Sequence, residues 1–380
     1  MTPVFVRIPG DLLAQTVQQV AVAVSVSSAQ PQNSMIHLHT SLNGLTLASG
    51  TSSGMVIQAK LPLDEGHCQT GSIAVPSRLF ADMIRKLPAG VVTLETQPPF
   101  LLKISSGSTL FRLYGMDPED SCSVPDLGIH LLDVELSSSQ FKKMVQQVVF
   151  ASARSNEARP VLTGALFHIT NGSMKLMATD GVRLASCTIH LERNLSNEVE
   201  VIIPSAYLKH VSKLLSGEKL RISFSNHRMV IQNQDLAAYI PLMTGSFPLM
   251  GTMISATYVT ELRVSSAALL SAIERVNLVA GGQTVLLNGT PHSLELSSNT
   301  PEVGDVQETT PVQNFQGEPF RIAFNGKYMQ DIIRVIDSEW ISIQYASPLK
   351  PLIVTAKPAP APPVSRPTGT HGPRRRTARC

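Results

Sequence analysis

The amino-acid sequence predicts an α+β fold in which three similar domains each pack two α-helices against antiparallel sheets. One pattern recurs three times: a β-compatible run, a Pro or Gly, a short amphipathic helix, a break and a second β-compatible run. Its equivalent positions are 128 and 121 residues apart and are Val75, Ile203 and Phe324. Pro76 and Pro204 suit the first turn of a helix, where a missing N–H group costs nothing.

A second pattern interleaves with the first: a short strand, a Ser or Gly-Asp cap signal, and a helix of about three turns. It begins at Val4, Leu132 and Val259. Six strand–helix–strands units therefore pair into three domains, with expected boundaries of 1–126, 127–254 and 255–356. Residues 357–380 are rich in Pro and Arg, so we expect a disordered tail. Its Arg run either contacts nucleic acid or has no binding role.

The predicted helices combine an apolar stripe with a polar face that is often basic. In the first helix the stripe is Leu13, Val17, Val20 and Val24. Basic residues follow in the later helices: Arg78, Arg85, Lys86, Lys142, Lys143, Lys209, Lys213, Arg275, Lys327 and Arg334. They form either ordinary solvated faces or one shared basic surface, and the sequence pattern alone leaves both interpretations open.

The formal net charge of +3 hides an uneven distribution. Residues 357–380 carry one Lys and five Arg without an acid, whereas residues 1–356 hold 25 basic and 28 acidic residues. Because the body is mildly acidic, contact with nucleic acid must use a local basic surface. No apolar run approaches the roughly 20 residues that span a membrane, and the N-terminus lacks a signal-peptide pattern. We therefore expect a cytoplasmic protein without a membrane partner.

The stretch 158–185 carries the strongest local signals in the chain. Asn171-Gly172 indicates a two-residue hairpin between β-compatible segments. Thr179-Asp180-Gly181 then predicts a turn in which the Gly takes a positive φ. This region is either a hairpin in a half-buried sheet or the wall of a site for a partner's peptide, with backbone groups and Arg183 fixing the peptide.

The sequence lacks the motifs of common catalytic sites. It has no P-loop, no GxGxxG after a strand, no HExxH and no GxSxG. His37 and His39 are better read as ordinary strand histidines than as metal ligands, and Asp180 as a turn-stabilising residue. The four cysteines are far apart and favour free thiols in a reducing compartment. We therefore expect a non-enzyme without metal or cofactor.

Several segments together resemble the bacterial β sliding clamp family, the processivity subunit of the replicative DNA polymerase, DNA polymerase III. They are ARPVLTGALF, ATDGVRLA, IIPSAYL, Phe247-Pro248, SSNTPEVG from Ser297 and FNGKYM from Phe324. The resemblance runs from about residue 4 to 356 and is closest to clamps of Gram-positive type. It implies the DNA clamp fold, a pseudo-sixfold half ring that forms a head-to-tail homodimeric ring around duplex DNA.

The resemblance also implies partners and sites. The basic residues named above, together with Arg154, would meet phosphates of double-stranded DNA without reading sequence. A pocket for short peptides of the polymerase catalytic subunit, clamp loader and other clamp-binding-motif proteins would use Leu162, Thr179, Gly181, Arg183, Leu184, Pro248 and Met253. The ring interface would place Phe111 and Leu113 against Leu278 and Val279, although packing within one subunit gives the same apolar pattern.

Two departures from the family pattern bear on function. The closing strand of the type VxxMPxR is absent, and PLKPLIVTAKP leads instead into the Pro/Arg tail. The first helix carries Gln rather than Lys on its polar face, and VSSAQPQN follows it. The leading hypothesis is a sliding clamp that tethers the polymerase. The alternative is a clamp-like paralogue that acts as a non-loading protein-interaction or regulatory subunit.

Overall fold

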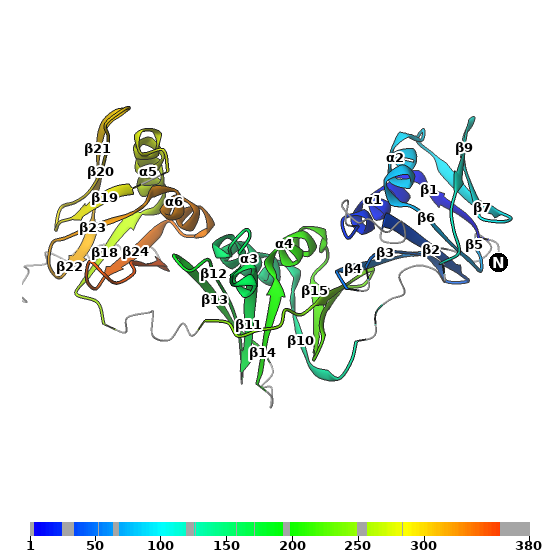
Figure 1. Cartoon of the computed structure of the whole chain (residues 1–380), viewed down its shortest axis with the longest axis horizontal. Helices are drawn as coiled ribbons and strands as arrows, with labels where there is room; N and C mark the ends of the chain where they lie inside the picture. Colours follow the sequence, from blue (N-terminus) through cyan, green and yellow to red (C-terminus); the bar gives the residue numbers. More distant parts are fainter. Residues whose placement is uncertain are drawn as a thin grey trace, which may run out of the picture. The chain divides into compact units, whose positions relative to one another are not determined.

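The computed structural model describes residues 4–24, 34–51, 53–63, 68–118, 125, 127–156, 158–170, 172–192, 198–248, 257–282 and 284–357. The chain forms two compact units, unit 1 (Met1–Pro248) and unit 2 (Leu249–Cys380). Strand pairs throughout both units are antiparallel, and the helices lie against the sheets within each unit (Figure 1). The α+β class and the three repeated domains predicted from the sequence are confirmed.

The first domain contains two strand–helix–strands repeats. Its elements are β1 (Phe5–Pro9), α1 (Gly10–Ala21), β2 (Met35–Ser41), β3 (Gly44–Gly50), β4 (Val56–Pro62), β5 (Cys68–Gln69), β6 (Gly71–Pro76), α2 (Ser77–Lys86), β7 (Val91–Gln97), β8 (Leu101–Ser106) and β9 (Thr109–Tyr114). One sheet has the order β5-β1-β7-β8-β9, so β9 is an edge strand of that sheet.

The second domain repeats the arrangement and adds two short 3-10 helices after its first α-helix. Its elements are β10 (His130–Ser137), α3 (Ser138–Val148), η3 (Val149–Ala151), η4 (Pro160–Thr163), β11 (Gly164–Thr170), β12 (Ser173–Thr179), β13 (Leu184–His190), β14 (Val199–Pro204), α4 (Ser205–Leu214), β15 (Lys219–Ser225), β16 (Arg228–Gln232) and β17 (Leu236–Pro241). Strands β11 to β14 form a sheet of order β13-β12-β11-β14.

A continuous sheet joins the first two domains. Its order is β10-β15-β16-β17-β4-β3-β2-β6, and the junction is the antiparallel pair of β17 with β4, in which Leu236 lies opposite Ala59. Each of these two strands is the third strand after a helix, β4 after α1 and β17 after α4. The hydrophobic core is correspondingly continuous across the two domains.

Unit 2 contains the third domain and has a core of its own. Its elements are β18 (Thr260–Ser265), α5 (Ser266–Ala280), β19 (Thr284–Gly289), β20 (Ser293–Thr300), β21 (Gly304–Pro311), β22 (Gln313–Gln316), β23 (Phe320–Asn325), α6 (Gly326–Val335), β24 (Trp340–Tyr345) and β25 (Ile353–Lys357). Its sheets have the orders β22-β18-β24-β25 and β21-β20-β19-β23.

Local signals explain where the helices begin. Ser137 accepts a hydrogen bond from the Gln140 backbone N–H at 3.1 Å, and the Gln140 side chain accepts one from the Ser137 N–H at 3.0 Å, which is a capping box. Pro76 and Pro204 occupy the residue before α2 and α4 rather than the first helical residue. Proline is tolerated there because this N–H group has no partner within the helix.

The apolar stripe predicted for the first helix is confirmed in its main part. Leu13, Val17 and Val20 are buried on α1, whereas Val24 lies beyond the end of that helix and is half-buried. In the second domain, Phe167 on β11 and Phe224 on β15 are both fully buried, with ring centroids 5.8 Å apart. This pair links the two sheets of the domain through tilted aromatic packing.

A pH-sensitive ion pair ties β10 to β15. Asp133 pairs with Arg221 and accepts a hydrogen bond of 3.0 Å from the His130 ring. Burial raises the pKa of the Asp133 carboxyl, but hydrogen bonds from Arg221, Ser223 and His130 together outweigh burial and lower it from 3.8 to about 2. A depressed carboxyl pKa stabilises the folded state above pH 3.8, and this contribution is lost as the pH falls towards 2.

Replacing Arg221 with Ala should therefore raise the pKa of Asp133 towards 3.8. We expect the free energy of unfolding of the variant to fall less steeply than that of the parent between pH 4 and 2. NMR titration of the carboxyl and denaturant unfolding across this range test both expectations. Arg7→Ala, which removes an exposed arginine from β1, is the control. An unchanged Asp133 titration in the Arg221 variant would contradict the assignment.

Among the described residues, no helix is both long and apolar enough to cross a membrane.

Candidate peptide pocket and nucleic-acid interface

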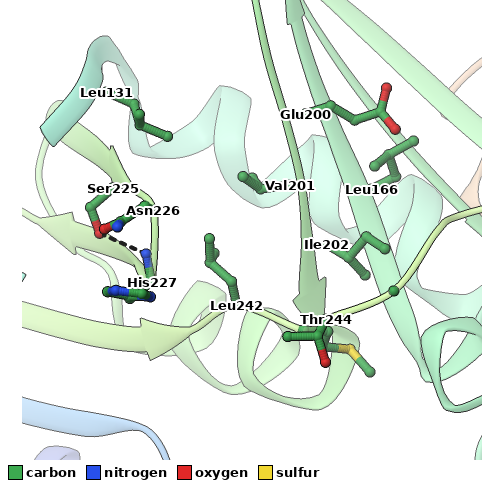
Figure 2. Close-up of a pocket in the computed structure, with 12 residues that line it drawn as sticks. Leu131, Leu166, Glu200, Val201, Ile202, Ser225, Asn226, His227, Leu242 and Thr244 are labelled. Atoms are coloured by element: carbon green, nitrogen blue, oxygen red, sulfur yellow. Dashed lines mark hydrogen bonds between the residues drawn. The ribbon is translucent and has the colours of Figure 1, made fainter. Parts of the chain in front are cut away.

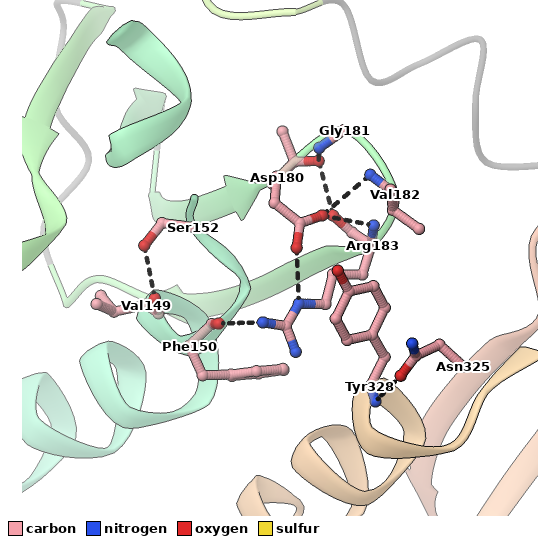
Figure 3. Close-up of polar contacts among 10 residues, drawn as sticks. Val149, Phe150, Ser152, Asp180, Gly181, Val182, Arg183, Asn325 and Tyr328 are labelled. Atoms are coloured by element: carbon pink, nitrogen blue, oxygen red, sulfur yellow. Dashed lines mark hydrogen bonds and ion pairs between the residues drawn. The ribbon is translucent and has the colours of Figure 1, made fainter. Parts of the chain in front are cut away.

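The turn between β12 and β13 is built by its own side chains (Figure 3). The buried Thr179 hydroxyl donates to the Arg183 carbonyl at 2.7 Å and accepts from the Gly181 N–H at 3.0 Å. The Asp180 carboxylate accepts from the N–H groups of Val182 and Arg183 at 3.0 and 2.9 Å. Gly181 has a φ of +94°, which explains the need for glycine there. The turn predicted from the sequence is confirmed.

The Arg183 side chain points into the domain and braces this turn. Its Nε donates to Asp180 Oδ2 at 3.0 Å, and a terminal nitrogen donates to the Phe150 carbonyl at 3.0 Å. The guanidinium lies 5.4 Å from the centroid of the Phe150 ring, within cation–π range (Figure 3). The side chains of Arg183 and Asp180 are each only 14% exposed. Arg183 is thus positioned to shape the turn, a role the sequence did not reveal because Phe150 is distant along the chain.

Two of the predicted pocket residues of unit 1, Arg183 and Leu162, each bond to the segment around η3. Leu162 is buried in η4, and its carbonyl accepts from the Ala153 N–H at 2.9 Å, just after η3. Gly245, three residues before Pro248, lies against η4, since a Cβ on Gly245 would lie 2.7 Å from Val161.

The remaining pocket predictions differ in how far the structure describes them. Leu184 and Pro248 are half-buried, whereas Val182 at the tip of the turn is 76% exposed. The predicted pocket residue Met253 lies outside the described residues.

A separate cavity of about 340 Å³ opens in the second domain (Figure 2). It lies beside β14 and the turn between β15 and β16, and its lining includes Leu131, Val201, Asn226, His227 and Leu242. None of the predicted pocket residues lines it. No local signal could have found this cavity, because its lining comes from five separate segments of the second domain.

The candidate DNA-facing residues lie on the helices or just after them. Arg78, Arg85 and Lys86 are exposed on α2, as are Lys209 and Lys213 on α4, whereas Lys142 on α3 is half-buried. Lys143, Arg154 and Lys327 are also exposed. Helix α1 carries Asp11 and no basic residue, as the sequence indicated.

Acidic neighbours compensate part of this basic surface. In unit 2, Arg275 forms a two-point contact with Glu308 at 2.6 and 2.8 Å, and Arg334 pairs with Glu274 at 2.8 Å. In unit 1, Arg85 pairs with Asp82 at 2.5 Å. These contacts weaken the case for Arg275, Arg334 and Arg85 as primary phosphate contacts.

Comparison with known proteins shows which family the chain belongs to. Residues 4–125, 135–249 and 252–361 match the N-terminal, central and C-terminal domains of the DNA polymerase III beta subunit. The beta sliding clamp of Halalkalibacterium halodurans is 32% identical over 361 residues, covering 91% of this chain and 94% of the relative. The chain belongs to the DNA polymerase III beta subunit family.

Solved clamp structures agree with this assignment. The DNA polymerase sliding clamp of Bacillus subtilis has a TM-score of 0.88 at 29% identity, covering 93% of this chain and 95% of that one. The DNA polymerase III beta chain of Streptococcus pneumoniae, at 24% identity and a TM-score of 0.87, supports the fold alone. The sequence-based likeness to beta clamps of Gram-positive type is confirmed.

The predicted beta-clamp interface residues differ in their exposure. Leu113 is buried in the core of its own domain and Phe111 is half-buried against that core. Packing within one subunit, the alternative that the sequence left open, therefore accounts for Leu113. Leu278 on α5 is 82% exposed and Val279 is half-buried.

The described residues hold no cluster of three or more His, Cys, Asp or Glu side chains suited to a metal ion. His37 lies on β2, and burial lowers the pKa of its imidazole. Cys187 on β13 is a free, half-buried thiol, and burial raises its pKa.

Proposed function

We propose that this chain is a sliding clamp that encircles duplex DNA as a head-to-tail homodimer and tethers the replicative polymerase for processive synthesis. The observation that carries the proposal is the match of all three consecutive domains to the beta subunit, across nearly the whole chain. A clamp needs no catalytic group, because retention on DNA comes from ring closure, and we accordingly expect no turnover.

The junction inside unit 1 supports a specific way of closing the ring. There, the third strand after α4, β17, pairs with the third strand after α1, β4. The corresponding strands β9 and β21 are both at sheet edges in the described parts of their units. An exposed edge offers backbone N–H and C=O groups for pairing with another chain. We infer that β9 of one copy pairs with β21 of the next, which repeats the internal junction.

Size measurements test this arrangement. The chain should behave as a dimer of about twice 41.0 kDa in sedimentation or light scattering. Leu278→Asp places a charge on α5, at the ring interface that the family resemblance implies. Because the Leu278 side chain is 82% exposed, we expect little effect on folding of the subunit. We expect this variant to be a monomer with an unchanged melting profile.

Leu42→Asp is the matched control, because Leu42 is 75% exposed in the turn between β2 and β3. This variant should remain a dimer. A monomeric parent chain, or equal effects of the two substitutions, would contradict the proposed interface.

Contact with DNA should rest on exposed basic residues of the helices, chiefly Lys209 and Lys213 on α4. Neutralising a phosphate releases condensed counterions, so each contact contributes about 0.9 to the slope of log affinity against log salt concentration. The double variant Lys209→Ala/Lys213→Ala should flatten that slope for duplex DNA of any sequence. Lys60→Ala/Lys219→Ala, which removes exposed lysines from β4 and β15, is the control. Equal slopes for both double variants would contradict the α4 assignment.

Polymerase, clamp loader and other proteins with clamp-binding motifs are proposed to dock on the second domain beside the turn at Thr179–Leu184. The braced turn and buried Leu162 favour this position, because a rigid polar turn beside apolar residues can fix a short peptide with little ordering cost.

A further inference from the structure

The third domain has one strand fewer than its two relatives within the same chain, counting described residues only. Strands β7, β8 and β9 follow α2, and β15, β16 and β17 follow α4. After α6 the described residues form only β24 and β25, and β25 is the edge of its sheet. In the other two domains, β8 and β16 occupy the equivalent position, and each is covered by a third antiparallel strand.

The side chains of β25 show the effect of this difference. Val354 lies opposite Ile343, as Ile104 lies opposite Leu94 in the first domain and Ile231 opposite Ile222 in the second. Ile104 and Ile231 are fully buried, whereas Val354 is half-buried and only packs at the margin of the unit 2 core.

The covering strands in the first two domains define what the described part of the third domain lacks. Phe111 of β9 lies opposite Ile104, and Leu113 lies opposite Leu102. On β17, Ala238 lies opposite Ile231, and Leu236, Ala238 and Ile240 are all buried. In both cases the covering strand places apolar side chains at alternate positions on the core face.

The edge of β25 is held in place at its end. The Lys357 carbonyl accepts a hydrogen bond from the Ser338 hydroxyl at 2.7 Å, and its ammonium lies 3.5 Å from a Glu261 carboxylate oxygen. Strand β25 also pairs with β24 along its whole length. An incoming strand therefore meets an ordered acceptor edge, which lowers the entropy cost of binding.

We propose that β25 accepts an extended segment of another protein as an added antiparallel strand, with apolar residues at alternating positions facing Val354 and Leu352. Backbone hydrogen bonds would supply the pairing, and the apolar residues would cover the margin of the unit 2 core, as β9 and β17 do elsewhere in the chain.

The sequence argues against the chain's own tail as the added strand. A return strand after a short turn would fall near residues 360–366, which contain Pro360, Pro362 and Pro363. Proline lacks the N–H group that a ladder requires, and prolines at both 362 and 363 remove donors from both sides of the strand. A second copy is also disfavoured, because the proposed ring already assigns the copy-to-copy contact to β9 and β21.

The test uses a fluorescent peptide with the sequence 234–242, which contains β17. Its affinity for the full chain is compared with that for a self-complemented chain, in which an Asn-Gly turn and the sequence of Asp235–Pro241 replace residues 358–380. Hairpin geometry then sets the grafted Leu, Ala and Ile opposite Ala356, Val354 and Leu352. A matched graft carries Ser in place of the Leu and Ile.

We expect the full chain to bind the peptide, the self-complemented chain to bind it at least tenfold more weakly, and the Ser graft to bind like the parent. No binding by the full chain, or equal binding by the parent and the self-complemented chain, would overturn the proposal. Binding that appears only after truncation at Lys357 would show that the tail covers the edge. Self-association that the graft abolishes would assign the edge to a second copy. Dimerisation through Leu278 is measured separately, so failure of the proposed ring can be distinguished from failure of the β25 proposal.

Discussion

A chain carrying Arg183→Ala should bind a clamp-binding peptide derived from the polymerase at least about tenfold more weakly, or about 1.4 kcal/mol. Arg183 holds the turn through Asp180 and the Phe150 carbonyl, and its guanidinium faces the Phe150 ring. Alanine leaves the Asp180 carboxylate, which is 14% exposed, without this charged partner. The loss should also lower the free energy of unfolding of unit 1 by about 1–3 kcal/mol.

Peptide titration and denaturant unfolding of the full chain measure these two effects. Arg183→Lys should recover only part of the affinity, because an ammonium cannot reproduce the planar contacts to Asp180 and Phe150. Val182→Ala is the local control, since Val182 is 76% exposed on the same turn. Unchanged peptide affinity in the Arg183→Ala chain would contradict the pocket assignment.

Phe167→Ala should destabilise unit 1 by about 3–5 kcal/mol. Phe167 is fully buried on β11 and its ring packs 5.8 Å from that of Phe224 on β15, so its loss leaves a cavity between the two sheets of the second domain. Because unit 2 has its own core, we expect a second unfolding transition that is unaffected.

Calorimetry and denaturant unfolding test this effect, with Leu42→Ala in an exposed turn as the control. A loss below about 1 kcal/mol would contradict the packing described between the two sheets. Equal shifts of both transitions would contradict the independence of the two cores.

Local and repeated features of the fold were predictable from the sequence. The repeat spacing located the helices after Pro76 and Pro204, and the Thr179-Asp180-Gly181 turn follows from side chains that bond to their own backbone. The turn signal lies within a few residues, and the repeat is found by comparing segments of the sequence, so both can be recognised without knowledge of the fold.

Features that depend on distant pairing were not predictable. The β4–β17 junction sets Leu236 against Ala59, and nothing in either strand specifies that partner. The assignment of Leu113 to its own core depends on which face of β9 meets the domain, a choice that alternation alone leaves open. The cavity beside His227 likewise arises only when several strands assemble.

The most direct test of the sliding-clamp proposal is retention on DNA of defined topology. The chain would be loaded onto a nicked circular duplex by a bacterial clamp loader and ATP. The bound fraction would be followed by gel filtration at a salt concentration that disrupts electrostatic binding of chains that do not encircle the DNA. We predict that the chain stays on the nicked circle and dissociates once a nuclease linearises the DNA. Equal loss from circular and linear DNA, or equal retention on both, would contradict a topological ring.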